Sequence, residues 1–237
     1  YKQNFYFEEF EKPHQSKINS INRQIGLIKQ ETSTFPKSVL EVSSMSFYNL
    51  IQFKKNGSKI LHALEPSITL KKRVKKINGL KIVNNFIEKL KSNIKYDLIL
   101  MSHVLEHLPN PSKALDQCYK NQKVGQKIFV EVPLFERTEL YPPSGLNVEH
   151  LYYFDENTLV KMIKNSGYEI LRVDKTYKST LLPFIAVIAS HGYIRSKTWK
   201  HRILKYVSKA IVLLVLFQIV FIAIYSTMHV KHSIGII

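Results

Sequence analysis

The chain has 237 residues and a net charge of +17, and 45% of its residues are hydrophobic. This hydrophobic share excludes wholesale disorder and is enough for one substantial domain with appendages. The single cysteine, Cys118, excludes an internal disulfide framework and a cysteine-rich zinc module within the chain.

One amphipathic segment stands out in the polar residues 1–35. Isoleucines recur there at spacings of three and four residues, which is the period of one helical face: Ile18, Ile21, Ile25 and Ile28. We therefore expect a helical extension over 1–35, ahead of a main domain that we place at 36–190.

Short apolar runs alternate with helical patterns throughout 36–190, as in βαβ units. We expect strands within 39–42, 58–66, 80–83, 98–101, 127–133, 169–174 and 181–190. No helical pattern separates the last two runs, so these two should pair antiparallel. The predicted fold is α/β, a Rossmann-like seven-stranded mostly parallel sheet with helices on both faces.

The C-terminal part, 191–237, combines a basic linker with an apolar segment. Residues 210–228 contain no charge and are long enough to cross the roughly 30 Å hydrocarbon layer of a membrane. Most of the nearby Lys and Arg residues precede the segment, which places the N-terminal bulk on the cytoplasmic side. We expect this apolar helix to contact a membrane; the alternative is a helix buried in the core or at a dimer interface. Without a visible signal peptide, the expected location is cytoplasmic or the cytoplasmic face of a membrane.

Polar side chains follow several of the predicted strands, where open parallel sheets bind their ligands. Glu65 ends the second strand and could accept two hydrogen bonds from a ribose diol, although a surface Glu beside a proline turn explains it equally simply. Asn85 and Phe86 follow the third strand and could contact an adenine. Ser102 and His103 follow the fourth.

The most specific motif is "DLILMSHVLEHLPNP" at 97–111, and with "SVLEV", "ALEPS" and "EHLYYFDENTLVKMIKNSGYEILRVD" it resembles class I S-adenosylmethionine-dependent methyltransferases. The resemblance is to the broad group that includes small-molecule and sugar C-methyltransferases. It covers about 36–190 and implies S-adenosyl-L-methionine as cofactor.

The resemblance also implies a set of cofactor-binding residues: Glu41, Ser43 and Met45 at the methionine end, Glu65 at the ribose, Asn85 and Phe86 at the adenine, and Ser102, His103 and Val104 beside them. The family's E-x-G-x-G-x-G loop is altered, because Ser43, Met45 and Phe47 stand at its glycine places. Glycine permits open backbone conformations and a close approach to the ligand, whereas Met45 and Phe47 add side chains where the ligand would press, so we expect a weakened grip on the cofactor.

Methyl transfer sometimes requires removal of a proton from the acceptor. His107 and His150 are the candidate catalytic bases, since an imidazole titrates near neutral pH; the simpler alternative is a structural histidine that bonds backbone carbonyls. His103 is a third candidate. No H-E-x-x-H spacing occurs, and we expect no metal site.

The leading hypothesis is methyl transfer to a small-molecule, sugar or lipid-linked acceptor. The alternative is a catalytically inactive methyltransferase-like binding protein at the membrane, which the missing glycines favour. Nucleic-acid modification ranks last, because the positive charge gathers beside the apolar segment. The sequence gives no oligomeric state.

Overall fold

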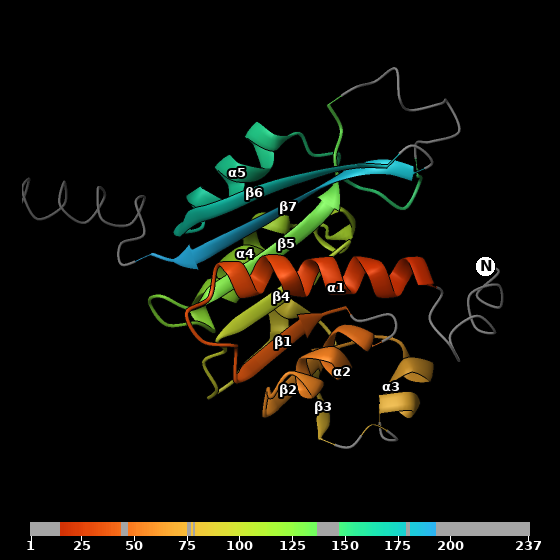
Figure 1. Ribbon diagram of the computed structural model, residues 1–237, viewed down its shortest axis with the longest axis vertical. Coiled ribbons are helices and arrows are strands. Elements are labelled where there is room, and N and C mark those ends of the chain that lie inside the picture. Colours follow the sequence, from red (N-terminus) through yellow and green to blue (C-terminus); the bar gives the residue numbers. More distant parts are fainter. Residues whose placement is uncertain are drawn as a thin grey trace, which may run out of the picture. The chain divides into compact units, whose positions relative to one another are not determined.

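The computed structural model describes residues 15–43, 47–74, 77, 79–136, 147–178 and 181–192. These residues form a seven-stranded sheet in the order β3-β2-β1-β4-β5-β7-β6 (Figure 1). The strands are β1 (Ser38–Val42), β2 (Ile60–Leu64), β3 (Leu80–Asn84), β4 (Leu98–Ser102), β5 (Lys127–Pro133), β6 (Tyr168–Lys178) and β7 (Leu181–His191). The first five pair in parallel, and β7 pairs antiparallel with both β5 and β6, as the sequence predicts.

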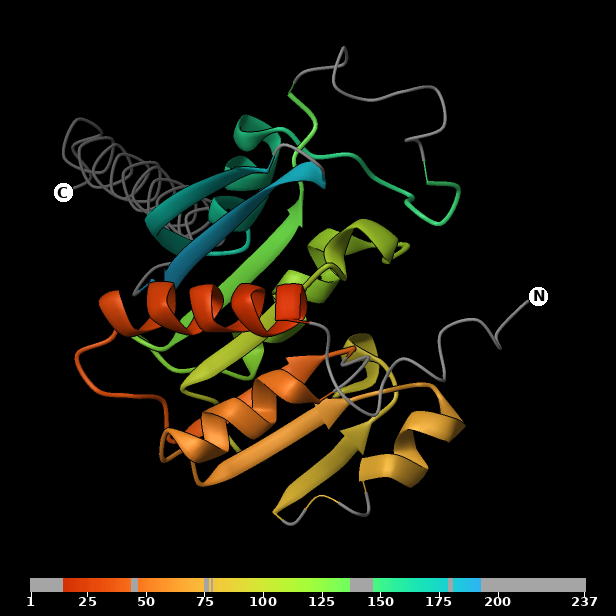
Figure 2. The ribbon, with the colours of Figure 1, turned by 45° about the vertical axis from the view of Figure 1, so that its right-hand side comes forward.

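Helices cover both faces of this sheet (Figure 2). One face carries α1 (Gln15–Gln30), α2 (Tyr48–Lys55) and α3 (Ile68–Val74). The other face carries the short helices η2 (Ile87–Lys89) and η3 (Leu105–His107), followed by α4 (Pro111–Lys120) and α5 (Glu156–Asn165). The expected α/β architecture is therefore present in the described part of the chain.

The central strands are apolar on both faces because both faces are covered. On β4, Leu98 and Leu100 pack on the α1 side, whereas Ile99 and Met101 pack on the α4 side, and all four are fully buried. Alternation along the strand thus supplies two hydrophobic layers from one short segment.

Helix α1 packs against the sheet through the predicted isoleucine face, since Ile21, Ile25 and Ile28 are buried. Burial of each such side chain stabilises the fold by about 1.5–3 kcal/mol. The predicted N-terminal extension is therefore part of the cover of the sheet, and this docking brings the polar side chains of α1 to the ends of β4 and β5.

Helix α5, which follows the last parallel strand in the chain, begins after an N-cap aspartate. Asp155 precedes α5, and its carboxylate accepts a hydrogen bond from the Thr158 backbone N–H at 2.6 Å.

Within the described residues, no helix combines the length and the apolar character that crossing a membrane requires. The apolar segment 210–228 lies outside the described residues, so its membrane contact stays a prediction.

Candidate active site

Two cavities open at the carboxyl ends of the parallel strands, where the sequence predicts a ligand site. The first has a volume of about 340 Å³ and lies beyond β1 and β4. Most of the predicted cofactor-binding residues line it: Glu41, Ser43, Asn85, Phe86, Ser102, His103 and Val104. Lys17 of α1 and Asn49 of α2 line it as well, and the sequence did not reveal them.

The second cavity has a volume of about 440 Å³ and is bounded by α1, by the segment after β4 and by β7. His107 and His150, the predicted bases, both line it together with Glu106. The two cavities share four residues: Lys17, Ser102, His103 and His107. Molecules bound in the two cavities would therefore contact a common wall.

The two described ends of the loop after β1, Ser43 and Phe47, have backbone conformations typical of glycine. Ser43 has φ 55° and Phe47 has φ 57°, both in the left-handed region that glycine occupies most easily. Phe47 is 1% exposed and packs in the core beneath α1 and α2, so it does not press on the ligand space as we predicted from the sequence. Met45 lies outside the described residues.

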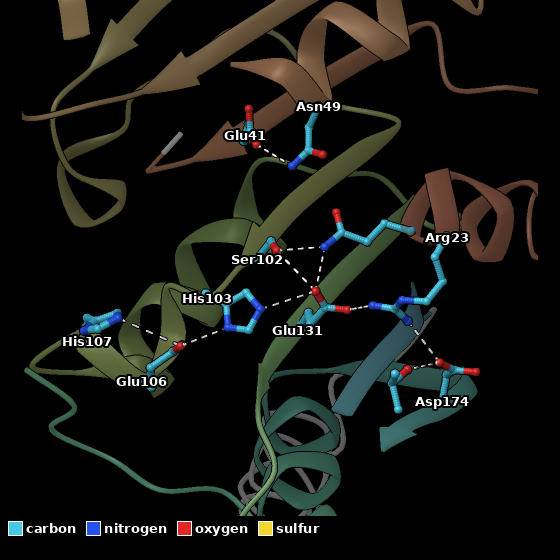
Figure 3. Close-up of polar contacts among 11 residues, drawn as sticks. Arg23, Glu41, Asn49, Ser102, His103, Glu106, His107, Glu131 and Asp174 are labelled. Atoms are coloured by element: carbon cyan, nitrogen blue, oxygen red, sulfur yellow. Dashed lines mark hydrogen bonds and ion pairs between the residues drawn. The ribbon is translucent and has the colours of Figure 1, made fainter. Parts of the chain in front are cut away.

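Glu41 closes the end of β1 through a contact with α2. Its Oε1 accepts a hydrogen bond from Asn49 Nδ2 at 2.8 Å, and both residues are buried (Figure 3). The side chain of Asn49 thus fixes the orientation of a carboxylate that faces the first cavity.

Glu65 is buried, but it does not line either cavity; the next residue, Pro66, does. Its Oε1 accepts a hydrogen bond from the Ser67 backbone N–H at 2.8 Å. Burial raises the pKa of the Glu65 carboxyl, and the Ser67 hydrogen bond opposes this rise. One carboxylate oxygen therefore holds the turn after β2, and the predicted ribose contact stays a prediction.

Asn85 and Phe86 stand at the mouth of the first cavity. The side-chain oxygen of Asn85 accepts a hydrogen bond from Lys71 Nζ at 2.5 Å, which directs the amide nitrogen away from the lysine. Phe86 is 47% exposed, so one surface of its ring is open to a planar group.

A buried carboxylate, Glu131 of β5, organises the base of the site (Figure 3). It accepts hydrogen bonds from the guanidinium of Arg23 and from Gln24 Nε2, the latter at 2.6 Å. Ser102 Oγ lies 3.0 Å from Gln24 Nε2, and His103 Nε2 lies 3.5 Å from Glu131 Oε1. Glu131 was not among the predicted site residues, although an acid inside the apolar run 127–133 was a usable signal.

His103 turns sharply from the end of β4 into the shared wall. Its φ is 53°, and its backbone N–H donates to the Glu131 carbonyl at 2.8 Å. Burial by itself lowers the pKa of His103, but the carboxylates of Glu106 and Glu131 outweigh this effect and raise the pKa to about 9. The side chain is 44% exposed, so solvent screens part of this attraction.

The pKa of Glu131 shifts in the opposite direction, downward. Its burial would raise its pKa, but the hydrogen bond with His103 and the charge of Arg23 together lower the pKa of the carboxyl. The strand end therefore carries an ionised, fully buried carboxylate between two cationic groups.

The two predicted bases meet beside a third group, Glu106. His107 Nδ1 lies 2.9 Å from the Glu149 carbonyl oxygen, and the His107 and His150 ring centroids lie 4.8 Å apart. His107 Nε2 is 3.9 Å from Glu106 Oε1. Burial, followed by the neighbouring His107, lowers the pKa of His150. His107 thus bonds a backbone carbonyl, as the structural alternative expects, but its other nitrogen faces a carboxylate.

Comparisons with known proteins identify the family to which this fold belongs. Residues 20–173 match a protein-family model described as a methyltransferase domain. This match spans more than half of the chain, so the chain belongs to the S-adenosylmethionine-dependent methyltransferases of class I, whose cofactor is S-adenosyl-L-methionine. No curated protein sequence matches the chain.

Solved structures share the fold at low identity. The 1,6-didemethyltoxoflavin N1-methyltransferase of Burkholderia thailandensis, solved with its substrate and S-adenosylhomocysteine, is 11% identical with a TM-score of 0.61, covering 78% of this chain and 84% of its own. Magnesium protoporphyrin IX methyltransferase from Synechocystis, with bound S-adenosylhomocysteine, is 13% identical with a TM-score of 0.61, covering 73% and 83%. The N-methyltransferase NodS from Bradyrhizobium japonicum, in complex with S-adenosylhomocysteine, is 12% identical with a TM-score of 0.60, covering 76% and 89%.

Proposed function

We propose that the chain transfers the methyl group of S-adenosyl-L-methionine, bound in the first cavity, to a small-molecule acceptor in the second. The observation that carries this proposal is the wall that the two cavities share at the end of β4, made by Lys17, Ser102, His103 and His107. Because the two cavities meet at these residues, a cofactor in the first cavity and an acceptor in the second can approach each other there.

The reaction needs alignment more than chemical activation. A lone pair of the acceptor attacks the methyl carbon while the carbon–sulfur bond breaks, and the electron pair of that bond stays on the sulfur. The positive sulfonium is thereby neutralised, and any proton that the acceptor loses passes to a nearby base or to water. The reacting atoms must be held about 3–3.5 Å apart, which a rigid strand end can do.

The first cavity offers a fitting group for each part of the cofactor. Glu41, fixed by Asn49, is an anion suited to the ammonium group of the methionine part. The left-handed backbone at Ser43 supports a close approach of the loop, as glycine would. At the other end, the open face of Phe86 suits adenine stacking, and the Asn85 amide suits hydrogen bonding to the base edge.

The acceptor class is proposed from the second cavity and from the relatives. A cavity of about 440 Å³ suits a small molecule. Two of the structural neighbours are methyltransferases named for the molecules 1,6-didemethyltoxoflavin and magnesium protoporphyrin IX. More specifically, we propose a sugar or lipid-linked acceptor. This proposal is supported only by the apolar segment 210–228, which would hold the domain at the cytoplasmic face of a membrane.

Calorimetric titration of the full chain with S-adenosylhomocysteine tests the proposal. We expect saturable one-to-one binding. Replacing Phe86 by Ala should weaken this binding about 5- to 10-fold, the loss of one stacked ring worth roughly 1–1.4 kcal/mol. Val124→Ala is the matched control, because Val124 is also an exposed apolar residue but lies in the loop before β5. Absence of binding at millimolar ligand would contradict the proposal and favour the noncatalytic alternative.

A further inference from the structure

We propose that Glu106, His107 and His150 bind a divalent transition-metal ion at the wall of the second cavity. Each residue offers one ligand atom, and these three atoms lie within 4.8 Å of one another. Glu106 and His107 come from the segment after β4, and His150 comes from the segment before α5. The fold therefore assembles the cluster from two places far apart in the sequence.

The Glu106 carboxylate is the first independent observation that points to a cation. The side chain is 1% exposed, and neither of its oxygens has a hydrogen-bond donor. The imidazole nitrogens of His103 and His107 lie 3.6 and 3.9 Å from Oε1, beyond a hydrogen bond, so the charge of His103 attracts this carboxylate without placing a donor at hydrogen-bond distance. A buried carboxylate normally has hydrogen-bond donors or a metal ion as partners, so its two oxygens are available as ligands.

The orientation of His107 is the second observation. A carbonyl oxygen can only accept, so the contact with Glu149 requires the proton to lie on His107 Nδ1. The other nitrogen, Nε2, then presents a lone pair toward Glu106. Metal-bound histidines are held in the same way, with the second ring N–H donated to a carbonyl or carboxylate.

The spacing agrees with one shared ion. Two ligand atoms that are each about 2.1 Å from an ion are at most about 4.2 Å apart. The 3.9 Å between His107 Nε2 and Glu106 Oε1 already satisfies this limit. The whole set, within 4.8 Å, needs only a small inward rotation of side chains at the cavity wall.

The donor set selects the class of ion. Two imidazoles and one carboxylate suit Zn²⁺, Mn²⁺, Fe²⁺ or Co²⁺, whereas Mg²⁺ and Ca²⁺ prefer oxygen ligands throughout. Three protein ligands also leave coordination positions open. All three residues line the second cavity, so the open positions face the space for the acceptor.

The position of the ion indicates which chemical group the acceptor carries, an inference that rests on the proposed function. A hydroxyl oxygen bound to the ion loses its proton more readily, so the expected acceptors carry a hydroxyl group beside the methylated position or at it. His107 and His150 would then act as ligands and not as the proton acceptors that we predict from the sequence, since a coordinated lone pair does not take up a proton.

The test is a Co²⁺ titration of the full chain, treated with a chelator and free of adenosyl ligands, followed by visible absorption. We expect one equivalent of Co²⁺ to bind and to show the d–d bands of nitrogen and oxygen ligands. Zn²⁺ should displace the bound Co²⁺, whereas an equal concentration of Mg²⁺ should not. Glu106→Gln and His150→Gln should each weaken binding by about tenfold or more. Histidines outside the described residues are the same in every variant, so any Co²⁺ that they bind is the same in each titration.

Glu169→Gln is the matched control, because Glu169 is an exposed carboxylate on β6, which carries none of the three ligands, and binding should match that of the wild type. Circular dichroism will check that each variant is folded, and His150 is partly exposed, so its substitution should leave the core intact. The proposal is overturned if no Co²⁺ binds at millimolar concentration, if Glu106→Gln and His150→Gln bind like the wild type, or if Glu169→Gln abolishes binding. A titration with S-adenosylhomocysteine on the same preparation separates this result from failure of the methyltransferase proposal.

Discussion

Restoring the family glycine at Phe47 should destabilise this protein. The ring is 1% exposed in the core beneath α1 and α2, and loss of a buried phenylalanine costs about 3–5 kcal/mol. Relief of the left-handed backbone at φ 57° returns roughly 1–2 kcal/mol. Glycine also frees the unfolded chain, which costs about 0.4–1 kcal/mol. The expected net loss for Phe47→Gly is therefore about 1.5–5 kcal/mol.

Two companion variants separate these contributions in urea unfolding of the full chain. Phe47→Ala loses the ring but keeps the strained backbone, so it should be less stable than Phe47→Gly. Ser43→Gly relieves φ 55° at a half-buried position and loses little packing, so it should raise the free energy of unfolding by up to about 1 kcal/mol. The reasoning is refuted if Phe47→Gly is as stable as the wild type, or if Ser43→Gly is the more damaging change.

Three other perturbations have defined outcomes. Glu131→Gln should lower the free energy of unfolding by about 2–4 kcal/mol, because Arg23 loses its fully buried partner; an unchanged urea midpoint would contradict the ion-pair network. The pKa of Glu131 is lower in the folded state than its usual 4.5, so the carboxylate stabilises the fold fully above about pH 4.5, and this stabilisation is lost as the pH falls through the folded pKa. Glu131→Gln should therefore flatten the dependence of the free energy of unfolding on acid pH. Parallel curves for the variant and the wild type would contradict this assignment. Gly192→Ala should destabilise by about 1–3 kcal/mol, since the added Cβ would lie 2.8 Å from the Gly167 carbonyl oxygen, and wild-type thermal stability would show that this end of β7 can shift.

The sheet was predictable because its strands are short and covered on both faces. Runs such as 98–101 are apolar at every position and are separated by helical patterns, which indicates a parallel sheet. The antiparallel end was predictable from the absence of a helix between β6 and β7. The family resemblance then placed the cofactor-binding residues at the ends of the first four strands.

The site was predictable only where it depends on strand ends. Ser102 and His103 follow β4 directly, and their place in the cavities follows from the topology. Lys17 and Arg23 reach the site from α1, and the docking of one helix on a sheet depends on packing that no local pattern encodes. Phe47 was misplaced for the same reason, because its position in the chain does not reveal on which side of the loop its ring lies.

The proposed metal cluster illustrates the limit of spacing arguments. His107 and His150 have no helical spacing that links them, so the sequence predicts no metal site. Tertiary structure brings the two rings to a centroid separation of 4.8 Å beside a buried carboxylate. The stretch His103-x-x-Glu106-His107 was a usable local signal for the first two ligands, whereas His150 joins them only in the folded chain.

The central claim is that an adenosyl donor binds at the ends of β1 and β4. A crystal structure of the chain soaked with S-adenosylhomocysteine tests it most directly. The account predicts the ligand in the cavity lined by Glu41, Phe86 and His103, with its sulfur toward the second cavity. An empty cavity in crystals soaked at millimolar concentration, or a ligand bound at a different face of the sheet, would contradict it.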